Sequence, residues 1–205
     1  MFKKAALAEE QLEDYELHHE VTHLLNQLGK HNSHWSSWDF LKVVKCLRSY
    51  SLIEYDDQNC TYSVHPLVQH WSATTTEKPR YFMQKCILSI IGLSVSYTFS
   101  NEDYKYRCTL LKHVTNAMDS VKKNEINPLV ASKIALIYDE QGYWKDAEAL
   151  GVVVMEKRKQ VLGDDHPDTL TSMGNLANTY RNQGHWKDAE ALQVVVMEKD
   201  RKSVV

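Results

Sequence analysis

Proline and glycine are scarce in this chain of 205 residues, which contains four prolines and seven glycines. Few positions therefore force a helix to stop, and the composition is rich in the helix-forming residues Leu, Ala, Lys and Glu. With 43% hydrophobic and 25% charged residues, the chain also lacks the composition of a disordered protein. We expect a folded, mainly α-helical protein.

An excess of positive charge is also missing. The sequence has 24 Lys and Arg against 27 Asp and Glu, and its net charge is −3. Nucleic acids and anionic membranes attract proteins with a basic face, so neither is expected as a partner. The most apolar segment, residues 86–99, is too short to span a bilayer. Glu9 and Glu10 interrupt the apolar start too early for a secretory signal, so we expect a cytoplasmic protein.

Two motifs of chemical sites are absent as well. The cysteines form no C-x-x-C pair that would indicate a zinc or redox site, because they are widely spaced at Cys46, Cys60, Cys86 and Cys108. The Gly29-Lys30 pair does not make a phosphate-binding G-x-x-x-x-G-K-[ST] loop, since Leu24 and His31 stand at two of its required positions. We therefore expect that the chain by itself neither hydrolyses nucleotides nor carries a cofactor.

One enzymatic motif does occur. His19-Glu20-Val21-Thr22-His23 matches H-E-x-x-H, in which two histidines on one helix face hold zinc and the glutamate takes a proton from the bound water. The extended motif fails, because Asn26 and Gly29 stand where a glycine and a third histidine belong. The two histidines should face solvent, because the helix expected over residues 1–30 has its apolar stripe at Leu17, Val21, Leu24 and Leu28. A zinc peptidase is therefore only the alternative, and we expect no enzymatic activity.

The middle of the chain changes from a helical to an alternating pattern and back. A helix is expected from Asp39, and residues 52–55 and 60–64 flank four turn-forming residues, which predicts a β-hairpin. Pro66 suits the first turn of the next helix. Together these elements read as a winged-helix unit. We expect it to pack against protein rather than DNA, because the cations of its helices and hairpin other than histidine are only Lys42, Lys45 and Arg48.

Residues 49–53 (SYSLI) and 62–71 (YSVHPLVQHW) resemble the winged-helix subdomain that follows the nucleotide-binding module in fungal NLR-type (STAND, NB-ARC-like) proteins. In that superfamily, a Met-His-Asp-like motif presents its histidine to the phosphates of bound ADP. The resemblance implies a nucleotide-sensing role for His65, although Val64 and Pro66 replace the Met and the Asp. The other interpretation of His65 is a helix N-cap or a buried hydrogen-bonding residue.

A polar linker is expected over residues 72–80, followed by helices at about 80–98 and 104–122. The second of these helices contains residues 107–113 (RCTLLKH), which are similar to an Arg-x-x-Leu-Leu-Pro-His stretch before the repeats of the fungal proteins, with Lys112 in place of Pro. We expect the two helices to cap the front of the repeats that follow.

The C-terminal third repeats itself at a period of 42 residues. Residues 141–157 recur as 183–199, and only positions 143/185 and 151/193 differ. The pattern matches tetratricopeptide repeats, with helix A at about 129–140 and 168–182 and helix B at 144–162 and from 186 onward. The linker LGDDHPDT, residues 162–169, resembles the kinesin-light-chain type and the repeats of the fungal proteins.

Helix A lines the concave face of such arrays. In this register the face carries Ser132, Lys133, Leu136, Asp139, Glu140, Thr171, Asn175, Asn178, Arg181 and Asn182. Asn175 and Asn178 resemble groove residues that hydrogen-bond a peptide backbone, since an amide offers a donor and an acceptor. The candidate peptide-binding residues are therefore Lys133, Asn175, Asn178, Arg181 and Asn182; solvated polar positions are the alternative. The last helix should expose apolar residues that favour self-association, namely Val194, Val195 and Met197.

These observations predict an all-α chain with a small β-wing, followed by an α-solenoid. We divide it into an N-terminal helical segment (1–31), a winged-helix-like unit (32–78), a helical connector (79–127) and about two tetratricopeptide repeats (128–205). The expected function is non-catalytic protein–protein interaction, through a protein or peptide on the concave face. The resemblance implies a fragment-like relative of fungal NLR-type signalling proteins. A kinesin-light-chain-like cargo adaptor is the alternative, although no heptad coiled coil precedes the repeats.

Overall fold

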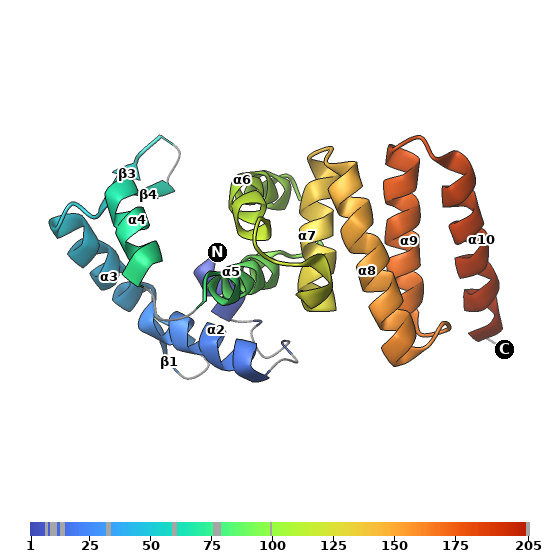
Figure 1. Ribbon diagram of the computed structural model, residues 1–205, viewed down its shortest axis with the longest axis horizontal. Coiled ribbons are helices and arrows are strands. Elements are labelled where there is room, and N and C mark those ends of the chain that lie inside the picture. Colours follow the sequence, from blue (N-terminus) through green and yellow to red (C-terminus); the bar gives the residue numbers. More distant parts are fainter. Residues whose placement is uncertain are drawn as a thin grey trace.

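The protein is described by a computed structural model, which covers residues 1–6, 8, 12, 15–31, 34–58, 61–75, 79–98 and 100–203. Helices dominate, which confirms the expected fold class, and the strands form two short antiparallel hairpins (Figure 1). The elements in chain order are α1 (Phe2–Ala6), α2 (Tyr15–Gln27), β1 (Lys30–His31), β2 (His34–Trp35), α3 (Ser37–Ser49), β3 (Ile53–Asp56), β4 (Thr61–Val64), α4 (Pro66–Thr75), α5 (Arg80–Ser94), α6 (Asn101–Met118), the 3-10 helix η2 (Lys123–Glu125), α7 (Pro128–Glu140), α8 (Trp144–Leu162), α9 (Pro167–Asn182) and α10 (Trp186–Ser203).

The N-terminal thirty residues do not form the single helix that their spacing predicts. α1 and α2 are separate helices, and Lys30 begins a strand that pairs with β2. The short α1 buries Ala5 and Ala6 and packs against α5, so contacts with a distant segment decide its position. Gly29 has a positive φ of 119°, and a Cβ there would lie 2.8 Å from the backbone oxygen of Ser36. Glycine is therefore required where the chain turns into the hairpin.

The hairpin predicted for the middle of the chain is confirmed. β3 and β4 pair in antiparallel register, with Tyr55 opposite Tyr62; Asn59 and Cys60 lie outside the described residues. The Ser36 hydroxyl caps α3 by accepting from the Asp39 amide. α4 continues to Thr75, so the expected polar linker begins later than the sequence indicates, and residues 76–78 are not described.

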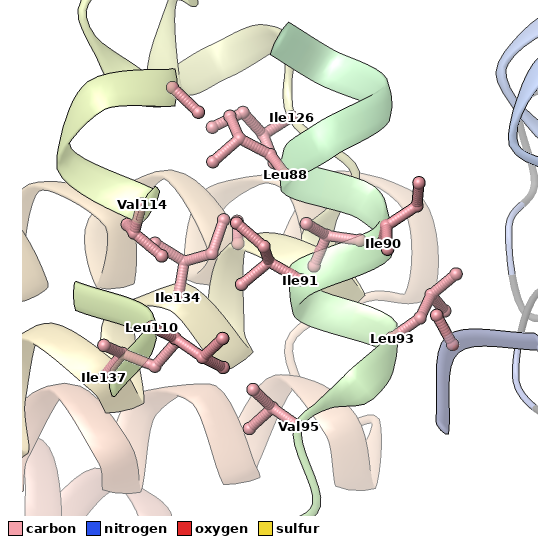
Figure 2. Packing of buried hydrophobic residues seen from close by; sticks show 14 of the residues in the cluster. Leu88, Ile90, Ile91, Leu93, Val95, Leu110, Val114, Ile126, Ile134 and Ile137 are labelled. Atoms are coloured by element: carbon pink, nitrogen blue, oxygen red, sulfur yellow. The ribbon is translucent and has the colours of Figure 1, made fainter. Parts of the chain in front are cut away.

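The main core forms where the connector meets the repeats. Figure 2 shows Leu88 and Ile91 of α5 facing Val114 of α6 and Ile134 of α7, and all four side chains are buried. A Cβ on Gly92 would lie 2.9 Å from a side-chain carbon of Val130 in α7, so glycine lets these helices approach closely. The expectation that the helices before the repeats cover their front is confirmed.

The four repeat helices lie side by side in chain order, from α7 to α10 (Figure 1). Their bounds agree with the predicted A and B helices to within one or two residues. Gly142, Gly163 and Gly184 all have positive φ and end the preceding helices, as the sequence predicts. Pro167 opens α9, and His166 caps it through Nδ1, which accepts from the Asp168 amide at 3.1 Å.

Candidate protein-binding groove

A groove of about 660 Å³ lies between α9 and α10. Its lining comes from both helices of the second repeat: Pro167, Leu170, Thr171, Gly174, Asn175 and Asn178 from α9, and Gln193, Val196, Met197 and Asp200 from α10. Thr171, Asn175 and Asn178 recur at helical spacing, so they share one face of α9. Both walls mix apolar and polar side chains: Leu170 lies beside amide and hydroxyl groups on α9, and Val196 and Met197 lie beside Gln193 and Asp200 on α10.

Two of the five predicted binding residues meet in this groove. Asn175 and Asn178 are both exposed, and the Asn178 side-chain oxygen accepts a hydrogen bond from the Arg181 guanidinium. This bond uses one of the two lone pairs of the Asn178 oxygen, so the side chain can still accept one hydrogen bond and donate through its nitrogen. Arg181 is exposed and is linked to the groove through its bond to Asn178.

The other two predicted residues lie elsewhere. Asn182 donates to Asp139 at 3.0 Å and so links α9 to α7. Lys133 is only 6% exposed, and its ammonium lies 5.8 Å from the centre of the Tyr97 ring. Burial lowers the pKa of Lys133. Lys133 therefore packs against the loop between α5 and α6, away from the groove.

Two further residues assigned to the concave face form hydrogen bonds with other side chains of the chain. Ser132 shares a hydrogen bond of 2.7 Å with the Tyr97 hydroxyl. Glu140 accepts two hydrogen bonds from the buried guanidinium of Arg107 in α6. The connector thus covers this part of α7, and the second repeat holds the more open surface.

The residues of α10 that line the groove were not among the predicted site residues. The 42-residue period could have identified them, because their counterparts in α8 contact α9. A Cβ at Gly151 would lie 3.2 Å from Leu176, and Arg158 donates to the backbone oxygen of Asp168 at 3.0 Å. The positions 42 residues later are Gln193 and Asp200, and both line the groove.

The groove lies on the part of α10 that corresponds to the covered part of α8. On α8, the surface around Gly151 is covered by a helix, α9. On α10, the equivalent surface is open, Val196 keeps the valine of Val154, and Gln193 replaces the glycine. The α8 positions that contact α9 thus recur on α10 among the residues lining the groove, with Gln193 in place of Gly151.

The residues of the zinc motif lie on α2. His19 and His23 are exposed on α2, as the sequence predicts, while Val21 is fully buried and the side chain of Leu17 lies outside the described residues. Among the residues that the structure describes, no group of three or more His, Cys, Asp and Glu side chains could hold a metal ion.

His65 lies between the hairpin and α4. Its side chain is exposed, and Nδ1 accepts from the Leu67 amide at 3.2 Å. The helix-cap interpretation of His65 therefore describes its contact in this structure. Any contact with a nucleotide would have to use the other ring nitrogen, Nε2.

Comparison with known proteins identifies the repeats. A family model described as tetratricopeptide repeat matches residues 128–201. No curated protein and no solved structure matches the chain. Residues 128–201 therefore contain tetratricopeptide repeats, a type of module that typically binds proteins and lacks catalytic activity. In the described part of the chain, no helix combines the length and apolarity needed to cross a membrane.

Proposed function

We propose that the protein is a non-catalytic interaction module, and that the groove between α9 and α10 binds a helical segment of a partner protein. The observation that carries this proposal is the repetition of one surface: α8 holds α9 through the same positions that α10 presents in the groove. Val196 and Met197 supply apolar area that a bound helix would bury. Asn175, Asn178 and Gln193 supply directional hydrogen bonds in the groove.

The same proposal includes the finer family relation. The resemblance of residues 49–53 and 62–71 to the winged-helix subdomain of fungal NLR-type proteins, together with the order α3, β3, β4, α4, supports a winged-helix-like unit over residues 32–78. In this proposal, the chain is a relative of those signalling proteins, acts in the cytoplasm and uses its repeats to recruit a partner. A kinesin-light-chain-like adaptor would use the same groove.

Self-association is a second use of the last helix. Val194, Val195 and Met197 are exposed on α10, and Met197 also lines the groove. A second copy that buries these residues would compete with the partner, because both would cover Met197. Added partner should therefore shift any dimer toward the monomer.

The test compares partner recovery by the full chain and by Asn175→Ala/Asn178→Ala. Quantitative mass spectrometry of proteins captured from a cell extract should find specific partners reduced at least about tenfold, since each lost hydrogen bond weakens binding by about 1 kcal/mol and unpaired groups on the partner add to the loss. Asn101→Ala/Asn116→Ala is the matched control, because it removes two exposed amides from α6. Equal recovery by both double variants would exclude the groove as the binding site.

A further inference from the structure

Residues 36–75 bury very little apolar surface. Val44 is the one buried hydrophobic side chain among the described residues of α3, β3, β4 and α4. Several large apolar side chains of the same elements are exposed, including Trp38, Leu41, Tyr62, Leu67 and Trp71. Exposed apolar residues that gather on one surface mark interaction sites in soluble proteins, so their arrangement on these elements matters.

One face of α3 organises part of this surface. Trp38, Leu41, Lys45 and Arg48 follow one another at intervals of three and four residues, so they form a single stripe along the helix. The first two side chains are apolar and the last two are cationic. The Lys42 ammonium lies 5.9 Å from the centre of the Trp38 ring, so Leu41 is the apolar residue of the stripe nearest to the two cations.

The hairpin and α3 together line a groove. A groove of about 550 Å³ is lined by Leu41, Val44, Lys45, Arg48, Ser49 and Tyr62. Tyr62 pairs with Tyr55, and their ring centres are 4.7 Å apart, so the tyrosines share the hairpin face toward α3. The Arg48 guanidinium lies 6.0 Å from the centre of the Tyr55 ring.

The charges of the hairpin are separated between its two faces. Side chains alternate along a strand, so Glu54 and Asp56 point away from the face of Tyr55. Among the described residues, those lining the groove include two cations and no carboxylate. The groove is thus positive, and the opposite face of the hairpin is acidic.

We propose that this groove between α3 and the β3–β4 hairpin binds an acidic amphipathic segment of a partner protein. A large apolar side chain of the segment packs against Leu41 and Tyr62, and carboxylates that follow it pair with Lys45 and Arg48. Charge complementarity sets the orientation of the segment, and the apolar contact supplies the buried area. This surface lies on other elements than the α9–α10 groove, so the two sites are independent.

Nucleic acid is disfavoured as the occupant. Of the three cations on α3, Lys45 and Arg48 line the groove, whereas Lys42 forms an ion pair with Asp39 at 2.9 Å. Two cations neutralise too few phosphates for useful affinity at physiological salt. The acidic face of the hairpin would also repel a duplex that extends beyond the groove.

The experiment selects ligands on the full chain from a phage-displayed library of random peptides of about 12 residues, a length that covers a groove of this kind. Selected peptides should combine Asp or Glu with Trp, Phe or Leu. Fluorescence polarisation of the best peptide should give about tenfold weaker binding to Lys45→Glu/Arg48→Glu, an effect typical of lost close charge pairs. Replacing the peptide carboxylates by lysines should restore binding to that variant. Lys105→Glu/Lys112→Glu, on the exposed surface of α6, should bind like the unaltered chain.

Three outcomes would overturn the proposal. The first is a selection that yields no acidic bias, and the second is equal binding of the selected peptide to both charge-reversal variants. The third is tighter binding of a fluorescent DNA duplex than of the peptide, with a loss of duplex affinity in Lys45→Glu/Arg48→Glu. That result would assign the surface to nucleic acid. Circular dichroism of each variant checks that the fold is retained.

Discussion

Arg107 of α6 holds both carboxylate oxygens of Glu140 in α7, with Nε 2.6 Å from Oε2 and Nη2 2.7 Å from Oε1. Its remaining nitrogen, Nη1, donates to the backbone oxygens of Ser96 and Thr98. The Arg107 side chain is only 1% exposed. One guanidinium therefore joins α6, the loop after α5 and the first repeat.

Removing Glu140 should destabilise this junction. Glu140→Ala leaves a buried guanidinium without its counter-charge, and breaking a buried pair in this way costs about 3 kcal/mol. Arg107→Met should cost less, because the Glu140 carboxylate is closer to solvent than the guanidinium is. Urea unfolding monitored by circular dichroism measures both changes in the free energy of unfolding.

The control for this pair is an exposed ion pair of the same chain. Lys42 and Asp39 lie 2.9 Å apart on the surface of α3, and Lys42→Ala should change the free energy of unfolding by less than about 1 kcal/mol. A Glu140→Ala effect no larger than that of Lys42→Ala would mean that the Arg107 junction contributes little.

The stability of the same region should depend on pH through Asp103. Hydrogen bonds from Ser100, Thr98 and Lys4 lower the pKa of Asp103 below its ordinary value. A lowered folded-state pKa stabilises the fold at pH values above the unfolded-state pKa of about 3.9, and this contribution is lost as the pH falls toward the folded-state pKa. Asp103→Asn should therefore be less stable than the unaltered chain at neutral pH, and the difference should shrink on acidification. Urea midpoints measured from neutral to acidic pH test this, and a constant or growing difference would contradict it.

Two glycines inside helices should respond to alanine in opposite directions. Gly92→Ala places a methyl group 2.9 Å from Val130, and such overpacking costs about 1–3 kcal/mol. Gly174 lies within α9 with no atom within 4 Å of the added methyl, so Gly174→Ala should stabilise the protein by up to about 1 kcal/mol through helix propensity. Thermal unfolding of both variants is the measurement. A destabilised Gly174→Ala chain would show that α9 packs differently from this description.

The repeats could be predicted from the sequence almost residue by residue, because each turn carries its own glycine, proline or histidine signal. The β3–β4 hairpin was also accessible from the alternation around its turn. The break between α1 and α2 was not, because it depends on α1 packing against α5, some eighty positions away in the chain. Local periodicity contains no information on such a contact.

The candidate site was predicted only in part for a similar reason. Asn175 and Asn178 could be found from helix spacing, since they lie on one face of α9. The burial of Lys133 could not be predicted, because it depends on Tyr97, which lies in a loop whose path cannot be inferred from local sequence patterns. The α10 residues of the groove could have been predicted from the repeat. The change from Gly151 to Gln193 is one of only two differences between the repeated segments, and it marks a position on this surface.

The central claim is that the α9–α10 groove binds a helix in the way that the surface of α8 binds α9. The difference between Gly151 and Gln193 provides its most direct test. Isothermal titration compares two peptides of residues 163–182, one native and one carrying Leu176→Ala, on the full chain and on its Gln193→Gly variant. We expect the unaltered chain to prefer the Leu176→Ala peptide, because a side chain at position 151 of α8 would crowd Leu176 and Gln193 is the α10 counterpart of Gly151. Gln193→Gly should reverse the preference and bind the native peptide about tenfold more tightly, or about 1.4 kcal/mol. The same order of affinities on both chains, or no binding of either peptide, would contradict the account.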